Sequence, residues 1–177
     1  MLKFVDFKVT FSEVPDEISL CINLSNCPHR CKGCHSAYLQ EDIGTILTTQ
    51  LLDKMIESND GITCVCFLGG DNDIPALTTL ADYVHKNHNL RTAWYTGLEW
   101  TPRQIDRPTC MAFDYIKTGP YIEERGPLTS RTTNQRMHAK GSVMHKMDAN
   151  PVMFYDITDR FWKDGNNNEE TRVETQP

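Results

Sequence analysis

Cys27, Cys31 and Cys34 are separated by three and by two residues, a spacing at which thiols can share one ligand. On a helix these positions would lie on one face. Pro28 removes a backbone donor and Gly33 weakens any helix, so the stretch favours a loop wrapped around something. Thiolates are soft ligands for zinc, copper(I) and iron–sulfur clusters. The stretch therefore indicates a metal site.

The number of thiols narrows the choice of metal. A structural zinc site is closed by four ligands, and a four-iron cluster held by cysteine alone also takes four. Three thiols leave one iron without a protein ligand, free to bind and activate a small molecule. The alternative is a zinc site completed by His29 or His35, although zinc prefers a fourth ligand at regular spacing. We predict a [4Fe–4S] cluster at Cys27, Cys31 and Cys34.

Four further segments follow the triplet along the chain. They are Gly69-Gly70-Asp71, Tyr95-Thr96-Gly97, Asp114-Tyr-Ile-Lys117-Thr-Gly-Pro-Tyr121 and Thr133-Asn134-Gln135-Arg136. The cysteine triplet resembles the signature of the radical S-adenosylmethionine enzymes. In this order and in so short a chain, the segments resemble the activating proteins of anaerobic ribonucleoside-triphosphate reductase, from about Glu17 to Arg136. The Gly-Pro-Tyr and Asn-Gln-Arg segments point to this branch.

The resemblance implies a cofactor, a reaction and two partners. The open iron of the cluster would bind the amino and carboxylate groups of S-adenosylmethionine. One electron, from a donor such as flavodoxin or ferredoxin, would cleave the cofactor into methionine and a 5′-deoxyadenosyl radical. That radical would remove a hydrogen atom from one glycine of the reductase. Few residues of a 177-residue chain remain to cover a small substrate, so a protein partner is expected to supply the cover.

The resemblance also implies which residues contact S-adenosylmethionine. Gly69 and Gly70 would let backbone approach the ligand, and Asp71 would accept a hydrogen bond from its ammonium, where the superfamily commonly has Glu. His35 would pack near the adenine, and Lys117 lies where some related activases have a lysine. The alternatives are a plain Gly-Gly-Asp turn, a solvated loop histidine and a surface lysine. The predicted cofactor-binding set is Gly33, Cys34, His35, Gly69, Gly70, Asp71 and Lys117.

Other interpretations stay open. Within the segment Asn134, Gln135 and Arg136, the arginine could hold a carboxylate, or the segment could pin the last strand. The chain could instead activate another glycyl-radical enzyme, or act as a radical enzyme on a small metabolite. From a different class, the rival is a non-catalytic zinc or iron–sulfur module.

Composition excludes several classes of protein. The formal net charge is −6, whereas a nucleic-acid-binding surface is usually basic. No apolar run approaches the length of a membrane span, and Asp6 stands where a signal peptide would be apolar. The seven cysteines are odd in number and three have ligand spacing, which fits a reducing cytoplasm better than a disulfide scaffold. Cys21, Cys64 and Cys66 are expected to be packed thiols, and the alternative for Cys64 and Cys66 is that they are reserve ligands.

Strand and helix patterns alternate along the chain. Strands are predicted at 17–24, 62–68, 91–96, 111–117 and 151–155, with an edge strand within 1–16. Helices are predicted to begin at Thr48 or Thr49, at Asp73 to Pro75 and at Thr101-Pro102. Such alternation implies right-handed crossovers and a parallel sheet, whose strand ends form one rim. The predicted fold is α/β, a partial (β/α) barrel of the radical S-adenosylmethionine type with a curved parallel sheet. Residues 1–162 would form the domain and 163–177 a polar, disordered tail.

Overall fold

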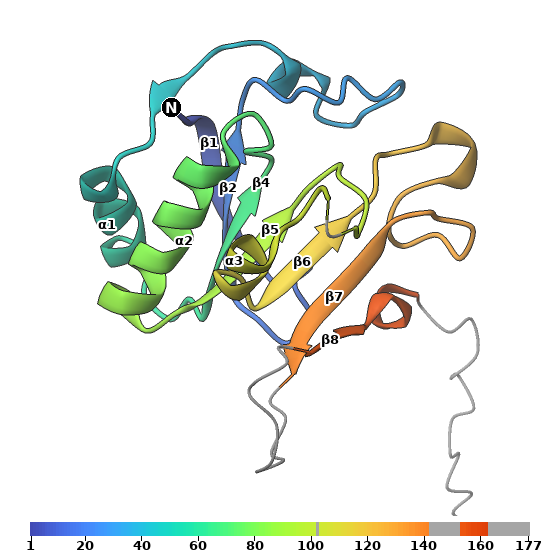
Figure 1. Cartoon of the computed structure of the whole chain (residues 1–177). Helices are drawn as coiled ribbons and strands as arrows, with labels where there is room; N and C mark the ends of the chain where they lie inside the picture. The colour runs from blue at the N-terminus through green and yellow to red at the C-terminus, as the bar shows by residue number, and fades with distance from the viewer. Residues whose placement is uncertain (102, 142–152, 163–177) are drawn as a thin grey trace, which may run out of the picture.

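The structure, a computed structural model, describes residues 1–101, 103–141 and 153–162. Within these residues the strands form one open sheet of eight, in the order β3-β1-β2-β4-β5-β6-β7-β8 (Figure 1). The elements are β1 (Lys3–Thr10), β2 (Ser19–Leu24), η1 (Ala37–Gln40), β3 (Thr45–Ile46), α1 (Thr49–Glu57), β4 (Cys64–Leu68), α2 (Ile74–His88), β5 (Arg91–Tyr95), α3 (Arg107–Met111), β6 (Tyr115–Thr118), η2 (Glu123–Arg125), β7 (Arg136–Gly141), β8 (Met153–Asp156) and η3 (Thr158–Phe161). The predicted tail, 163–177, and the start of the predicted strand 151–155 lie outside the described residues.

The four central strands run parallel, as predicted. β2 pairs with β4, β4 with β5 and β5 with β6 in parallel. β1, β3, β7 and β8 pair antiparallel, so the sheet is mixed and the prediction of a parallel sheet holds only for its centre. The connections 11–18 and 119–135 carry no α-helix. Without a helical crossover, neighbouring strands run antiparallel.

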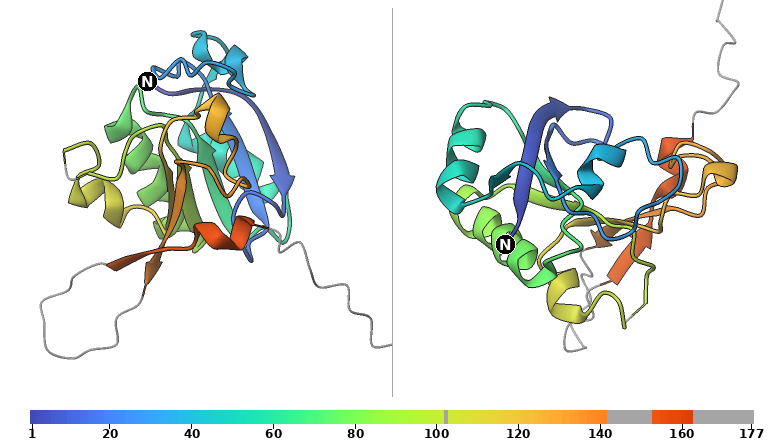
Figure 2. Two further views of the ribbon diagram at one scale, coloured as in Figure 1. Left: turned by 90° about the vertical axis from the view of Figure 1, so that its right-hand side faces the viewer. Right: turned by 90° about the horizontal axis from the view of Figure 1, so that it is seen from above.

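Both faces of the central strands are buried. α1, α2 and α3 lie along one side of the sheet, as seen from above in Figure 2. Leu20 and Ile22 of β2 belong to the core beneath these helices. Cys21 belongs to a second core on the other face, together with Cys64 and Cys66 of β4. All three thiols are fully buried, which confirms the prediction that they are packed side chains.

Capping residues decide where the first two α-helices begin. Thr48 Oγ1 accepts a hydrogen bond from the Leu51 amide at 3.3 Å, and Asp73 Oδ1 accepts one from the Ala76 amide at 3.2 Å. Each side chain satisfies an amide that has no partner within its helix. Pro75 occupies the second position of α2, where a missing amide costs nothing. Both helix starts were predicted from the sequence.

The predicted start of the third helix is wrong. The helix α3 begins at Arg107, not at Thr101, and Asp106 Oδ1 caps it by accepting from the Thr109 amide at 2.9 Å. The Thr101 carbonyl accepts from the Gln104 and Ile105 amides, which makes a turn that does not continue. Asp106 followed by Pro108 is a complete helix start, with a capping side chain and a proline in the first turn.

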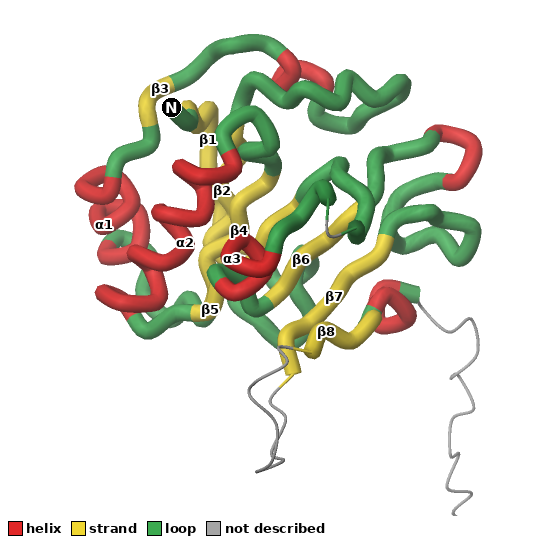
Figure 3. The backbone as a smooth tube through the Cα atoms, viewed as in Figure 1, coloured by secondary structure: helices red, strands yellow, loops and turns green. Residues whose placement is uncertain are grey.

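Loops follow the carboxyl ends of β2, β4, β5 and β6 and gather at one edge of the sheet (Figure 3). This is the rim on which α/β sheets carry their sites. None of the helices in the described ranges has the length and apolar character needed to span a bilayer.

Gly44 provides a test of the pairing between β1 and β3. Its φ is +93°, and a Cβ built on it would overlap the carbonyl oxygen of Phe4. Gly61 has a similar φ of +83° but open space around the same position. Alanine at either site must adopt a left-handed backbone conformation, which lowers the free energy of unfolding by about 1 kcal/mol. We expect Gly44→Ala to lower the free energy of unfolding in urea by about 2 kcal/mol more than Gly61→Ala, because only Gly44 faces backbone. Equal losses would show that β3 does not pack on Phe4.

Candidate functional site

The cysteine loop, residues 25–36, leaves the carboxyl end of β2. Its base is closed by two backbone hydrogen bonds of 3.0 Å, from the Asn26 amide to the Glu41 carbonyl and from the Cys27 amide to the Leu39 carbonyl. Further on, Gly33 has a φ of +70°, a value that favours glycine. The loop therefore turns back on itself, as Pro28 and Gly33 predicted.

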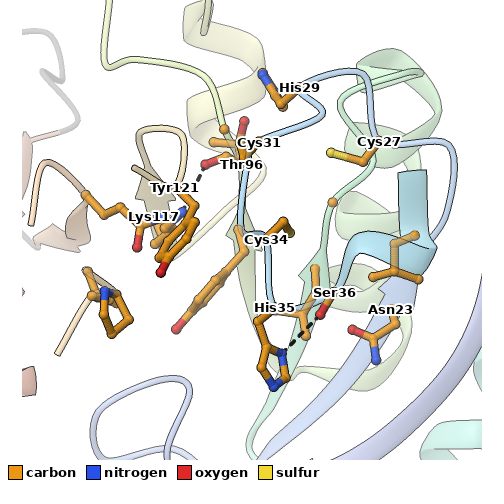
Figure 4. A pocket seen from close by; sticks show the side chains of 18 of the residues that line it. Asn23, Cys27, His29, Cys31, Cys34, His35, Ser36, Thr96, Lys117 and Tyr121 are labelled. Carbon is orange, nitrogen blue, oxygen red and sulfur yellow. Dashed lines mark hydrogen bonds between the residues drawn. The ribbon is translucent and has the colours of Figure 1, made fainter. Parts of the chain in front are cut away.

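The three cysteines of this loop are free, half-buried thiols. Cys27, Cys31 and Cys34 line one cavity of about 690 Å³ (Figure 4). No three His, Cys, Asp or Glu side chains within the described part of the chain already converge as a metal-binding group. The donor set nevertheless fits an iron–sulfur cluster, because it consists of soft thiols on one loop beside a cavity. Binding a cluster requires these side chains to turn toward a common centre.

The ends of three parallel strands complete the cavity. Gly69 and Asp71 follow β4, Thr96 and Gly97 follow β5, and Lys117 is the penultimate residue of β6. All five line the cavity with the cysteines. This gathering was predicted from the parallel crossovers. Cys34 and His35, both in the predicted cofactor-binding set, also line it.

Two predicted residues do not line the cavity. Gly70 has a φ of +96°, and a Cβ built on it would meet the side chains of Leu24 and Leu77 at 3.0 and 3.1 Å. A side chain there would therefore disturb the core beneath the helices. Gly33 is exposed, and its missing Cβ leaves room for the carboxylate of Glu123. Neither glycine belongs to the lining of this cavity, and their predicted contact with a cofactor stays a prediction.

The comparison with known families decides what kind of domain this is. The family model described as a 4Fe-4S single cluster domain matches residues 18–138, which is more than half of the chain and includes the whole cysteine loop. The chain belongs to this family. No curated protein and no solved structure matches it. The family supports the predicted iron–sulfur cofactor, while the individual ligands and S-adenosylmethionine remain predictions.

Asp71 of this 4Fe-4S domain is almost completely enclosed. Its side chain is 2% exposed, and its Oδ1 accepts a hydrogen bond from Thr96 Oγ1. The Leu98 amide in turn donates to Thr96 Oγ1 at 2.9 Å, which fixes the hydroxyl. His29 Nε2 lies 3.3 Å from the same carboxylate oxygen. The carboxylate predicted to meet the cofactor's ammonium is thus already engaged by protein groups.

Lys117 is a buried ammonium rather than a surface lysine. Its Nζ donates to the Gly119 carbonyl at 3.0 Å and lies 3.5 Å from the Thr96 carbonyl. Burial lowers the pKa of Lys117 to about 8, although Asp71 and the loop cysteines act in the opposite direction. A poorly solvated positive charge beside a cavity is suited to binding an anionic group, such as a carboxylate.

The Asn134–Arg136 segment connects the start of β7 to the loop that follows β6 through hydrogen bonds. Asn134 Nδ2 donates to the Pro120 carbonyl at 2.9 Å, and Gln135 Nε2 donates to the Gly119 carbonyl at 3.3 Å. Arg136 is occupied by the Thr133 and Gln135 carbonyls at 2.8 and 2.7 Å. Of the two roles left open by the sequence, these contacts favour the structural one.

His35 is an exposed loop side chain at the cavity wall. Its Nδ1 lies 3.4 Å from Ser36 Oγ, within hydrogen-bond distance. This position fits both the predicted stacking on adenine and a solvated histidine.

Sequence reasoning missed the wall that β1 contributes. Asp6 and Lys8 line the cavity together with the strand ends. Asn23 Nδ2 donates to Asp6 Oδ1 at 2.5 Å, and the Tyr38 hydroxyl donates to Asp6 Oδ2 at 3.2 Å. The available signal was the alternation of these two charged residues with apolar ones along the strand.

Proposed function

We propose that this iron–sulfur domain is a radical S-adenosylmethionine activase that generates the glycyl radical of anaerobic ribonucleoside-triphosphate reductase. The observation that carries the proposal is the composition of one cavity. Three loop thiols, in a sequence without a fourth ligand of regular spacing, share the cavity with Gly69 after β4 and Lys117 of β6, the two parallel strands on either side of β5. A cluster held there would keep one iron open toward a ligand in the cavity.

The residues of the chain would hold and orient the cofactor. Cys27, Cys31 and Cys34 would bind the cluster, and Lys117 would face the carboxylate of S-adenosylmethionine. Gly69, which lines the cavity, would present its backbone to the ligand; its φ of +100° favours glycine, and a Cβ there would lie 3.1 Å from the Leu24 carbonyl oxygen. When bound, the reduced cluster would supply the one electron needed to cleave the cofactor's C5′–S bond, and the deoxyadenosyl group released would take the α-hydrogen of a glycine.

The remaining parts of the proposal concern fold, partners and location. The four parallel strands with helices on one side support a partial barrel of the radical S-adenosylmethionine type. The reductase would close the cavity with the segment that carries its glycine, and flavodoxin or ferredoxin would deliver the electron. This chemistry would suit the cytoplasm, where thiols stay reduced.

An electron paramagnetic resonance experiment tests this function. The anaerobic, reduced protein is mixed with S-adenosylmethionine and the anaerobic reductase of the same genome. We expect a persistent doublet, because the unpaired electron on a glycine Cα couples to its one remaining α-hydrogen. Reductase containing deuterated glycine should collapse the doublet and place deuterium in 5′-deoxyadenosine.

The other outcomes separate the rivals. Cleavage of S-adenosylmethionine that proceeds equally without the reductase, and never yields the doublet with it, would indicate a radical enzyme for a small metabolite. A doublet on a different glycyl-radical enzyme alone would reassign the partner. Reconstituted protein that binds a cluster but never cleaves the cofactor would be a non-catalytic module, and protein without a visible charge-transfer band would be a zinc module.

A further inference from the structure

His29 lies between the first two cysteines of the loop and reaches across to the end of β5. A Cβ built on Gly97 would lie 2.5 Å from His29 Cδ2 and 2.8 Å from its Nε2. The histidine ring therefore occupies the space that any other residue at position 97 would fill. The φ of Gly97 is not in the left-handed region, so a glycine is needed here for space and not for backbone conformation.

The same ring faces a buried carboxylate. His29 Nε2 is buried and makes no well-aligned hydrogen bond to any of the described residues. The nearest charged oxygen is Asp71 Oδ1, at 3.3 Å. A buried carboxylate is costly unless donors surround it. Thr96 supplies one donor to Asp71, and a small rotation of the His29 ring would supply a second.

We propose that His29 is a positioning residue. Its ring packs against Gly97 and faces Asp71, and these contacts hold the middle of the cysteine loop at the ends of β4 and β5 before a cluster is bound. The base of the loop is held by backbone hydrogen bonds at Asn26 and Cys27. His29 holds the part between Cys27 and Cys31. A loop ordered in advance loses less conformational entropy when its thiols gather around a cluster.

This inference rests on the iron–sulfur part of the proposed function and is independent of the activase reaction. In this role, His29 Nε2 faces Asp71 and does not bind metal. The proposal therefore differs from the zinc interpretation, in which His29 would be the fourth ligand.

The test uses the full chain, first without metal and then reconstituted with iron and sulfide under anaerobic conditions. The variants are His29→Ala, Gly97→Ala, the double variant, and His29→Gln, whose amide nitrogen is as many bonds from Cβ as Nε2 is. The first measurement is the rate at which iodoacetamide alkylates Cys27, Cys31 and Cys34 in metal-free protein, resolved by peptide mass spectrometry. The second is the lifetime of the reconstituted cluster against an iron chelator.

We expect His29→Ala and Gly97→Ala each to raise alkylation of the loop thiols by about tenfold, because losing the buried contact of the His29 ring with Gly97 and Asp71 lets the loop open more often. Cluster lifetime should shorten in the same variants. The double variant should be no worse than either single variant, because Gly97 acts through His29. His29→Gln should restore both measurements toward the wild-type values.

The matched control is His88→Ala. His88 Nε2 contacts Asp53 Oδ1 at 2.7 Å between α1 and α2, so this variant removes a comparable His–Asp pair away from the cavity. It should lower thermal stability and leave loop alkylation and cluster lifetime unchanged. A change in either loop measurement would mean that general destabilisation, not the His29 contact, controls the loop.

Three results would overturn the proposal. Wild-type alkylation and cluster lifetime in both His29→Ala and Gly97→Ala would remove the positioning role. Additive effects in the double variant would show that Gly97 does not act through His29. An altered electron paramagnetic resonance spectrum of the reduced cluster in His29→Gln would make His29 a ligand. If the wild-type protein takes up no iron, the proposed function fails, while the alkylation rates still test the contact.

Discussion

Replacing Cys31 with Ala is expected to abolish the iron–sulfur cluster and, with it, cleavage of S-adenosylmethionine. Cys31 is the middle thiol of a loop that offers three, and two thiols cannot hold a four-iron cluster whose open iron must stay free. Anaerobically reconstituted Cys31→Ala should retain almost no iron and show no visible charge-transfer band. Cys27→Ala and Cys34→Ala should behave in the same way, because all three thiols line one cavity.

The chain offers two matched controls for this result. Cys66 is a fully buried thiol of β4, and Cys110 is a half-buried thiol of α3 outside the cavity lining. Their alanine variants should keep full iron content, and Cys66→Ala should cost about 1 kcal/mol or more of stability through lost packing. Full iron content in Cys31→Ala would contradict the assigned ligands.

Lys117→Met is expected to weaken binding of S-adenosylmethionine by about 10- to 100-fold while the cluster still assembles. The reason is the loss of a charge-assisted hydrogen bond to the cofactor's carboxylate in a poorly solvated cavity. The same change should raise the free energy of unfolding at pH 7, because methionine removes a charge that is costly to bury. Affinity and stability would thus move in opposite directions, which a general folding defect cannot produce.

The pH dependence follows from the position of this ammonium. Burial lowers the pKa of Lys117 from its ordinary value of 10.5 to about 8, so between these pH values the unfolded chain binds more protons than the fold does. The free energy of unfolding of the wild type, relative to Lys117→Met, should therefore rise with pH across that window. Cofactor affinity should fall as pH rises through about 8, because the ammonium loses its charge.

Titration calorimetry and urea unfolding at several pH values measure both effects. Lys54→Met, which removes an exposed charge on α1, is the control and should leave cofactor affinity unchanged. Unchanged affinity in Lys117→Met, at pH 7 and at pH 9, would show that Lys117 does not meet the cofactor.

Local patterns in the sequence determined much of the architecture. The starts of α1 and α2 could be predicted because a cap such as Thr48 or Asp73 bonds to an amide only three residues away. The buried parallel strand β4 could be predicted because its apolar run suits a strand covered on both faces. Strand ends meeting at one rim follow from parallel crossovers, so Gly69, Asp71 and Lys117 were expected beside the cysteine loop.

Contacts between distant residues were decided by the tertiary structure. The antiparallel flanks of the sheet depend on β7 returning beside β6, and no short-range pattern specifies that neighbour. Most lysines lie on the surface, so burial of Lys117 could not be predicted from its residue type. It is buried because the carbonyls of Gly119 and Thr96 surround its ammonium. The role of Arg136 was open because a guanidinium can bind a ligand or a backbone equally well.

The same holds for the orientation of each side chain at the site. In the sequence, Asp71 and His29 belong to separate motifs, and the Asp71 carboxylate was predicted to bind a cofactor. Only the fold shows that they face each other, 42 positions apart in the chain, beside a glycine that leaves room for the ring. Residue types and their spacing determine which chemistry is available, because they specify the atoms that can donate, accept or bind metal. Packing decides which of those atoms meet, because burial and direction depend on every element that closes around them.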